Sequence, residues 1–524
     1  MPRPARACAA LLLLLLAPAH CSYEPDTYHE FLRAAMKPKS VSSAAEVDAQ
    51  HWAEEAQAAI AARLAQSPVH TKARNVVMFL GDGMSVPTLA AARTLLGQRR
   101  GATGEEAQLA FEKFPTVGLA KTYCVDAQVA DSACSASAYL CGAKANIATI
   151  GVSARVPRAH CTAARHAPHH LSSIAEWALL DGRDAGIVTT TRVTHASPAG
   201  AYAHTAHRDW ESDADVAASC GAAAAPQSDI ALQLVHHHPG NQFKVILGGG
   251  RREFLPNSSV DEEGSSGRRL DGRDLIQEWQ DDKKARNVSY QYVWNREQLI
   301  NTSAELPEYL LGLFEGSHMQ YHMQGDPKTE PTLAELTEVA IRSLSRNKNG
   351  FFLFVEGGRI DHAHHENLVQ MSLDETIQLS EAVTRAAELL PEDESLLVVT
   401  SDHAHVMSIS GYSSRGSDII GPSDDAGDDG VPYMTLSYAN GPGYRAPPPG
   451  VPRDDVTRYN YRDVNFAFPA AVPLSSETHG GDDVAVFARG PHHGMFTGLY
   501  EQSQLPHLMA YAACMGPGRH ACQH

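Results

Sequence analysis

The sequence predicts an α/β fold: a three-layer sandwich with a large, mainly parallel central sheet, plus a loop-rich inserted subdomain. Three observations lead to this prediction. Short apolar runs recur along the 524 residues, Ala-rich segments with helical patterning alternate with them, and a stretch rich in Gly, Pro, Ser, Asp and Tyr interrupts the pattern late in the chain. At 43% hydrophobic residues, the chain can bury one large core.

The expected strands are apolar runs that each end in a turn containing Gly or Asp. Their apolarity is continuous rather than alternating, which is typical of strands buried on both faces of a parallel sheet. The runs are 76–80, 185–188, 244–247, 351–355, 396–399 and 484–487. Segments 89–96, 133–140 and 335–344 are expected as helices that cover the sheet.

Shifts in composition divide the chain. Residues 1–21 have a basic start, an apolar run and small residues near a cleavage position, which is typical of a secretory signal peptide too short to span a membrane. We expect one catalytic domain over 22–510, with an N-terminal arm helix at about 48–66, an irregular block at about 251–331 and the insertion at about 411–475. Residues 511–524 form a C-terminal segment.

Charge and targeting signals restrict partners and location. A net charge of -18 argues against a nucleic-acid partner, because phosphate-backbone binding needs clustered Lys and Arg. The signal peptide predicts an extracellular, secreted protein. The chain stops at Cys522-Gln523-His524 without the hydrophobic tail of a lipid-anchor signal. Attachment to the outer face of the plasma membrane is the alternative, for an isoform that carries such a tail.

Export makes the cysteines and sequons interpretable, since disulfides persist outside the cytosol. Removal of Cys8 and Cys21 with the signal leaves seven of nine cysteines, so at least one thiol stays free or pairs between chains. Disulfides are expected for Cys161–Cys220 and Cys514–Cys522, although the sequence proves neither. The N-glycosylation candidates, expected at the surface, are Asn257, Asn287 and Asn301.

Acidic residues follow three of the predicted strands. Asp82 comes after 76–80, Asp361 after 351–355 and Asp402 after 396–399. One such residue is commonly a turn or a helix cap, but three beside histidines predict a metal site, because chemistry collects at the carboxyl ends of parallel strands. Asp361 and His365 lie four residues apart and can hold one ion from one helix face. Mixed imidazole and carboxylate ligands favour zinc, whereas oxygen ligands alone favour magnesium.

Ser132 begins the Ala-rich segment and is the candidate nucleophile. A helix N-terminus stabilises phosphate through its free N–H groups and dipole. Alone, Asp131-Ser132 is more simply an ordinary cap. Beside metal ions, the serine hydroxyl can ionise and attack phosphorus.

Six segments together carry a family resemblance. They are Gly81-Asp82-Gly83-Met84, Asp131-Ser132-Ala133, residues 191–198, residues 355–365, Ser401-Asp402-His403 and Glu477-Thr478-His479. In order and spacing, from about residue 30 to 515, they resemble the successive motifs of animal alkaline phosphatases.

The resemblance implies two zinc ions, one magnesium ion and a set of site residues. The implied ligands are Asp361, His365 and His479 for the first zinc; Asp82, Ser132, Asp402 and His403 for the second; and Asp82, Ser197 and Glu356 for magnesium. His195 and His362 match histidines near magnesium, with a packing role as the alternative. Arg208 matches an arginine that clamps two phosphate oxygens.

The resemblance also implies activity and assembly. Small phosphate monoesters would be hydrolysed through a phosphoserine on Ser132, which a zinc-bound hydroxide then removes. A homodimer is implied, with contributions from the arm helix and the crown-like insertion. A calcium site is implied as well, with solvated surface acids as the alternative; its candidates are Glu263, Phe314, Glu315 and Glu330.

Some features depart from the family or favour rivals. Cys124 and Cys134 flank the nucleophile, so an extra disulfide or a reactive thiol is expected there. His364 and the run 236–238 match no motif and are expected at the surface. A sulfatase or phosphodiesterase would have a related fold, but residues 132–136 lack the sulfatase pattern Cys/Ser-x-Pro-x-Arg. A non-catalytic binding protein is disfavoured because every expected metal ligand is present.

Overall fold

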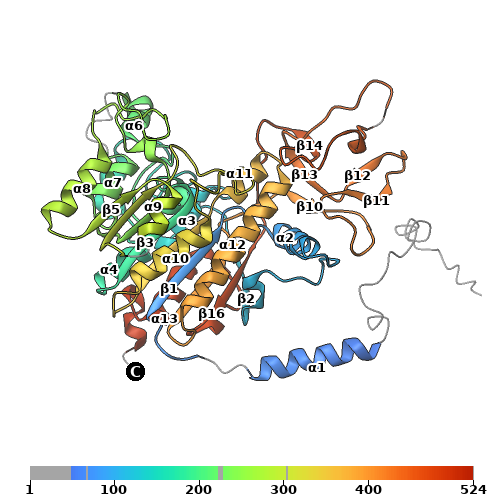
Figure 1. The fold of residues 1–524 in the computed structure, drawn as a ribbon, viewed down its shortest axis with the longest axis horizontal. Coiled ribbons are helices and arrows are strands. Elements are labelled where there is room, and N and C mark those ends of the chain that lie inside the picture. The colour runs from blue at the N-terminus through green and yellow to red at the C-terminus, as the bar shows by residue number, and fades with distance from the viewer. Residues whose placement is uncertain (1–48, 66–68, 222–227, 303–304, 452, 523–524) are drawn as a thin grey trace, which may run out of the picture. The chain divides into compact units, whose positions relative to one another are not determined.

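The computed structural model describes residues 49–65, 69–221, 228–302, 305–451 and 453–522. The predicted signal peptide, 1–21, lies outside the described residues. Within them, ten strands form one sheet in the order β17-β2-β16-β8-β1-β7-β3-β4-β6-β5 (Figure 1). The bounds in that order are Gly498–Glu501, Thr116–Lys121, Val484–Arg489, Ser395–Thr400, Asn75–Gly81, Phe351–Gly357, Asp184–Arg192, Val245–Gly249, Tyr309–Leu313 and Tyr290–Val293.

All six predicted strands are present in this sheet, which is mainly parallel as expected. The exception is β16, which runs antiparallel to both β2 and β8. Run 484–487 was expected to be a parallel strand like the others. That prediction is wrong for this strand. A continuous apolar run reports burial on both faces of a sheet but carries no information about strand direction.

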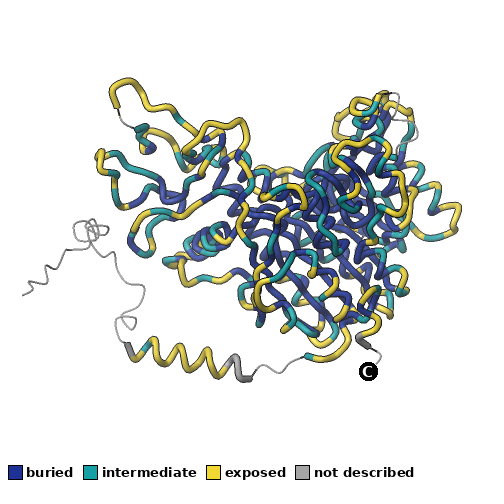
Figure 2. The backbone as a smooth tube through the Cα atoms, turned by 180° about the vertical axis from the view of Figure 1, so that it is seen from behind, coloured by how far each residue is buried: buried dark blue, intermediate teal, exposed yellow. Residues whose placement is uncertain are grey.

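Two hydrophobic cores lie on opposite faces of the sheet and define three layers. Along β1, Val76 and Met78 belong to one core, while Val77 and Phe79 belong to the other. The first core is covered by α3 (Ser132–Cys141), α4 (Ile174–Leu180), α7 (Ile230–His236), α8 (Leu275–Ala285) and α13 (Leu505–Ala513). The second is covered by α2 (Val86–Arg99), α10 (Leu333–Leu344) and α12 (Val369–Leu389). Figure 2 shows the buried backbone concentrated in these layers.

The arm helix is α1 (Ala49–Ala65), close to its predicted bounds. Over residues 50–61 every side chain except that of His51 is exposed, and Trp52 and Ile60 are 50% and 56% exposed. Residues 50–61 therefore belong to neither core of this chain.

The block at 251–331 is not irregular throughout, contrary to expectation. It contributes α8, α9 (Arg296–Thr302) and two strands of the main sheet, β5 and β6. β5 lies at the edge of the sheet and is mostly half-buried, so its sequence lacks the continuous apolar run of a central strand.

The insertion at 411–475 is loop-rich, as predicted. Its described residues contain no α-helix, and it supplies most of two small sheets. One sheet consists of β10 (Met407–Ile409), β13 (Leu436–Gly441) and β14 (Ala470–Pro473), and the other of β11 (Pro422–Ala426) and β12 (Pro432–Met434). β9 (Ala404–His405) pairs antiparallel with β15 (His479–Gly480) and joins the two ends of the insertion.

The described cysteines include two disulfide pairs and one free thiol. Disulfides join Cys161 to Cys220, as predicted, and Cys124 to Cys134, so the reactive-thiol alternative is wrong. Cys141 is a buried free thiol. Cys514 is disulfide-bonded, while the side chain of Cys522, its predicted partner, lies outside the described residues. The three sequon asparagines and residues 236–238 are exposed, as expected.

Candidate metal centre

The carboxyl ends of three neighbouring strands gather the predicted carboxylates. β1 lies between β7 and β8 and pairs in parallel with both. Asp82 directly follows β1, Glu356 is the next-to-last residue of β7, and Asp402 follows β8. All three side chains are fully buried. Parallel pairing therefore brings together acids that are up to 320 residues apart in the chain.

The residues of the first predicted zinc site converge on one point. Asp361 and His365 lie on α11 (Arg359–His365), with His365 Nε2 3.4 Å from Asp361 Oδ2. His479 Nε2 is 3.3 Å from Asp361 Oδ1 and 3.1 Å from His365 Nε2. Three potential ligand atoms thus face a common space.

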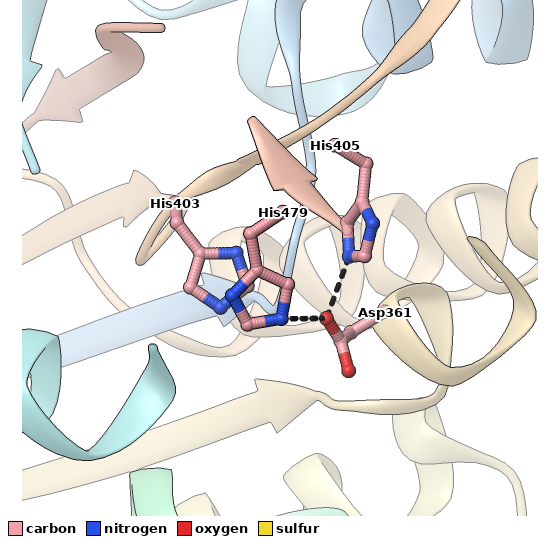
Figure 3. A group of neighbouring side chains, drawn as sticks. All are labelled: Asp361, His403, His405 and His479. Atoms are coloured by element: carbon pink, nitrogen blue, oxygen red, sulfur yellow. Dashed lines mark hydrogen bonds and ion pairs between the residues drawn. The ribbon is translucent and has the colours of Figure 1, made fainter. Parts of the chain in front are cut away.

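The second predicted zinc site adjoins the first. His403 Nε2 lies 2.9 Å from Asp402 Oδ2 and 3.6 Å from Asp82 Oδ1. Ser132 Oγ is 3.3 Å from the same nitrogen. The His403 ring stacks on His479, with centroids 3.5 Å apart, so the two groups are neighbours (Figure 3).

The predicted magnesium ligands lie on the other side of Asp82. Ser197, on α5 (Ala196–Ala199), donates a hydrogen bond of 3.4 Å to Asp82 Oδ2. Glu356 Oε2 accepts bonds from Thr189 and Thr191 at 2.5 and 3.1 Å. Asp82, His195 and Glu356 form one candidate metal-binding group. Asp82 is thereby shared between two groups.

Unsatisfied oxygens at this centre fit bound cations. Asp82 Oδ1 and Glu356 Oε1 are buried and accept no hydrogen bond. Burial, followed by repulsion from Asp402, raises the pKa of Asp82 well above its usual range, and burial raises that of Glu356 to about 7. Buried carboxylates are normally paired or coordinate metals. The mixed donors around Asp361 suit zinc, and the oxygens of Asp82, Ser197 and Glu356 suit magnesium.

Arg208 is held from two sides beside this centre. Its Nη1 pairs with Asp131 Oδ2 at 3.0 Å, and its Nη2 donates to His195 Nε2 at 3.2 Å. Burial, then the charge of Arg208, lowers the pKa of His195 well below its ordinary value. His195 is therefore neutral and can accept this bond. The arginine is fixed before any ligand arrives.

His362 and His195 belong to a cluster that includes His318, a residue outside every sequence motif. The ring of His318 lies 4.3 Å from His362 and 5.3 Å from His195, centroid to centroid. Burial lowers the pKa of His362 to about 3. The three imidazoles therefore form one cluster, and His195 connects it to Arg208.

His405 and Glu477 complete the centre and were missed as site residues. His405 Nε2 lies 2.6 Å from Asp361 Oδ1, and its Nδ1 contacts Glu477 Oε2 (Figure 3 shows the first contact). Burial disfavours its charged form, but Asp361 and Glu477 raise the pKa of His405 to about 10. The available signals were the second His of Ser-Asp-His-Ala-His and the acid of Glu-Thr-His.

His364 is the clearest correction to the sequence interpretation. It was expected at the surface, yet its side chain is completely buried. His364 Nε2 bonds Thr88 at 3.0 Å, and its Nδ1 bonds Tyr438 of the insertion at 2.8 Å. Residues of α2 and β13 cover this face of α11. A histidine that matches no motif can therefore still be buried.

The calcium candidates form a partly buried group. Gln320 donates through its backbone N to Glu330 Oε1 at 2.6 Å and through its side chain to Glu315 Oε1 at 3.1 Å. Burial, then the charges of Glu315 and Glu263, raises the pKa of Glu330 to about 8. Arg251 pairs with Glu263 at 2.9 Å. Glu315 is directly preceded by the buried Phe314.

This fold and this edge of the sheet define a metal-dependent phosphatase. Residues 73–515 match the sequence model of the alkaline phosphatase family. The chain belongs to the alkaline phosphatase family, and hydrolysis of phosphate monoesters is the activity that the family and the fold support.

Known relatives agree over nearly the whole chain. The membrane-bound alkaline phosphatase of Bombyx mori is 60% identical, across 95% of this chain and 91% of that protein. The tissue-nonspecific isozyme of Gallus gallus is 46% identical, across 91% and 92%. A mutant of TAB5 alkaline phosphatase, from an Antarctic bacterium, with Mg bound in its M3 site shares the fold at 19% identity and a TM-score of 0.59, over 85% of this chain and 99% of that one. None of the described helices is long and apolar enough to cross a membrane.

Proposed function

We propose that this phosphatase acts through a phosphoserine on Ser132, with two zinc ions and one magnesium ion at the strand edge. The residues that would hold these ions are Asp361, His365 and His479; Asp82, Ser132, Asp402 and His403; and Asp82, Ser197 and Glu356. When bound, the ions stabilise negative charge on the attacking and departing oxygens.

The position of Ser132 carries the proposal. It is the first residue of α3, so the backbone N–H groups of Ser132 and Ala133 have no partner within the helix and are available to phosphate oxygens. Asp131 caps the next N–H, that of Cys134, at 3.3 Å. The side chain of Ser132 meanwhile faces His403.

The chain's own residues define two displacements. Ser132 Oγ attacks phosphorus, a bond from Oγ to phosphorus forms, and the ester bond breaks to release the alcohol. Arg208 donates two hydrogen bonds to non-reacting phosphate oxygens, a geometry for which its planar guanidinium is suited. Water then attacks the same phosphorus, regenerates Ser132 and releases inorganic phosphate.

Replacement of the nucleophile tests the mechanism. Ser132→Ala should lower kcat for an aryl phosphate by more than about 10³-fold and abolish phosphorylation of the tryptic peptide that contains residue 132 after an acid quench. Ser135→Ala is the matched control, because this hydroxyl lies on the same helix, is buried and makes no hydrogen bond. Retained turnover in Ser132→Ala would overturn the proposal.

We also propose a calcium ion held by Glu263, Glu315, Glu330 and the backbone of Phe314. The support is the raised pKa of Glu330, which burial and neighbouring carboxylates cause and a cation would relieve.

Extracellular location and a homodimer complete the proposal. The exposed Trp52 and Ile60 of α1 support a second copy as the partner of that helix, which light scattering on the secreted protein tests.

A further inference from the structure

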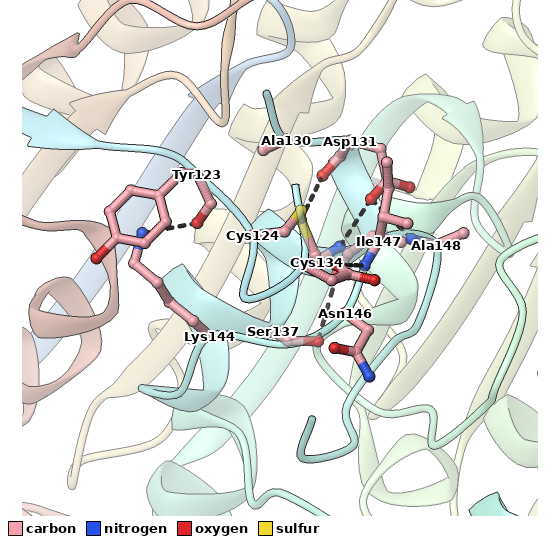
Figure 4. Close-up of a disulfide and its surroundings, with 12 residues drawn as sticks. Tyr123, Cys124, Ala130, Asp131, Cys134, Ser137, Lys144, Asn146, Ile147 and Ala148 are labelled. Carbon is pink, nitrogen blue, oxygen red and sulfur yellow. Dashed lines mark hydrogen bonds between the residues drawn. A yellow bond between two sulfur atoms is a disulfide. The ribbon is translucent and has the colours of Figure 1, made fainter. Parts of the chain in front are cut away.

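The segment between β2 and the nucleophile helix is closed by the Cys124–Cys134 disulfide (Figure 4). Cys124 lies three residues after β2, and Cys134 is the third residue of α3, two positions after Ser132. Both cysteines are 2% exposed. The covalent link therefore ends in the first turn of the helix that presents the nucleophile.

One carboxylate connects Cys134 to the arginine of the phosphate site. Asp131 Oδ1 accepts the backbone N–H of Cys134 at 3.3 Å and that of Ala148 at 2.9 Å. The other oxygen, Oδ2, pairs with Arg208 Nη1 at 3.0 Å. Displacement of the Cys134 backbone would therefore move the group that orients Arg208.

The residues that follow Cys124 bond to the turn 145–148, which Asp131 also contacts. Val125 N donates to Ala145 O at 3.0 Å, and Ile147 N donates to Asp126 Oδ1 at 2.8 Å. Residues 145–148 thus contact the segment on both sides of the disulfide. Cys124 and Cys134 are tied to each other through this turn as well as through sulfur.

Packing alone would hold this segment weakly. The buried cluster here consists of the two cysteines with Ala130 and Ala145, and only Ala127 and Ile147 pack against it. Val125 and Val129, within the closed segment, are 56% and 37% exposed. Small side chains bury little apolar area, so the covalent link adds to the hydrogen bonds that hold this segment.

We propose that the Cys124–Cys134 disulfide is a positioning element of the phosphate site, which acts on phosphate through Asp131 and Arg208. The inference rests on the proposed function of Arg208. It predicts that loss of the disulfide weakens phosphate binding more than it slows the chemical step, because Ser132 itself stays on an intact helix.

The test compares Cys124→Ala/Cys134→Ala with the wild-type holoenzyme. The inhibition constant of inorganic phosphate and the KM for an aryl phosphate should both rise about tenfold, with a smaller change in kcat. Cys141→Ala is the matched control, since it removes a buried sulfur from the same helix without touching Asp131. Its inhibition constant should stay within about twofold of wild type.

A double-mutant cycle separates an effect on the position of Arg208 from a general loss of order in this segment. In an Arg208→Ala background, removal of the disulfide should change the inhibition constant by less than about twofold. An equal fold-change in both backgrounds, or no change in the wild-type background, overturns the inference while the proposed function stands. An Arg208→Ala variant with unaltered phosphate inhibition overturns the clamp and this inference together. Cys124→Ser/Cys134→Ser, checked by circular dichroism and metal content, repeats the comparison if the alanine variant does not fold.

Discussion

Two clusters of charge in this protein, one of buried carboxylates and one around a buried arginine, have opposite character. The strand-edge cluster, Asp82, Glu356, Asp361 and Asp402, contains carboxylate oxygens without hydrogen-bond partners. The arginine cluster, Arg269 with Asp229 and Asp271, is built of direct ion pairs at 3.0 Å or less. The difference teaches that Asp229 is balanced by a cation within the chain, whereas Asp82 and Glu356 keep buried oxygens without partners that a bound cation would balance.

The arginine cluster is satisfied by the chain itself. Arg269 is completely buried, and its Nη1 and Nη2 each bond an oxygen of Asp229 at 3.0 Å. Asp229 also caps α7 by accepting the N–H of Leu232 at 2.8 Å. No external ion is needed, because every charge has an opposite charge in contact.

Removal of metal ions should have the largest effect on the strand-edge cluster. Dialysis against a chelator should reduce hydrolysis of an aryl phosphate by more than about 10³-fold, because the strand-edge carboxylates lose their counter-ions. Zinc and magnesium together should restore the rate. Metal content measured by mass spectrometry beside activity checks this outcome. Full activity in protein that contains no zinc would contradict it.

In metal-free protein, one neutralising substitution in each cluster should change the free energy of unfolding in opposite directions. Asp229→Asn leaves Arg269 partly uncompensated and should lower the free energy of unfolding by about 3 kcal/mol. Asp82→Asn relieves repulsion from Asp361, Asp402 and Glu356 and should raise it by about 1 kcal/mol. Urea unfolding of both variants measures the difference. Two changes of the same sign would refute the distinction between the clusters.

Glu375 offers an intermediate case, a buried acid outside both clusters. Burial, then repulsion from Asp374, raises its pKa from the ordinary 4.5 to about 7. The folded state therefore favours the neutral acid, and the free energy of unfolding should fall as pH rises from about 4.5 to about 7, by on the order of 2 kcal/mol. Glu375→Gln should remove this loss in metal-free protein, whereas Glu381→Gln, exposed on the same helix, should retain it.

Calcium should give the smallest effect. In the zinc- and magnesium-loaded protein, added calcium should raise the unfolding temperature by roughly 2–4 °C, because it neutralises Glu315 and Glu330. Glu330→Gln should lose most of this increase. Differential scanning calorimetry with magnesium as the competing ion measures it, and an equal increase in both proteins would argue against the site.

Much of the strand-edge site could be predicted because its signals are local. Asp82, Asp361 and Asp402 each follow a recognisable strand, so parallel pairing alone brings them to one edge. His405 is different. Its contact with Asp361 depends on the pairing of β9 with β15, which aligns His405 with His479 across the insertion. No local pattern encodes that register.

By itself, the sequence determined six of the ten strands of the main sheet, the acids and histidines that follow some of them, and that nine cysteines cannot all pair within one chain. It could do so because continuous apolarity, helix caps and residue counts are properties of neighbouring residues. Only the tertiary structure decided that β16 runs antiparallel, that His364 is interior and that Cys124 and Cys134 are joined. These depend on contacts between distant segments, whose energies arise from packing and pairing after the chain has folded.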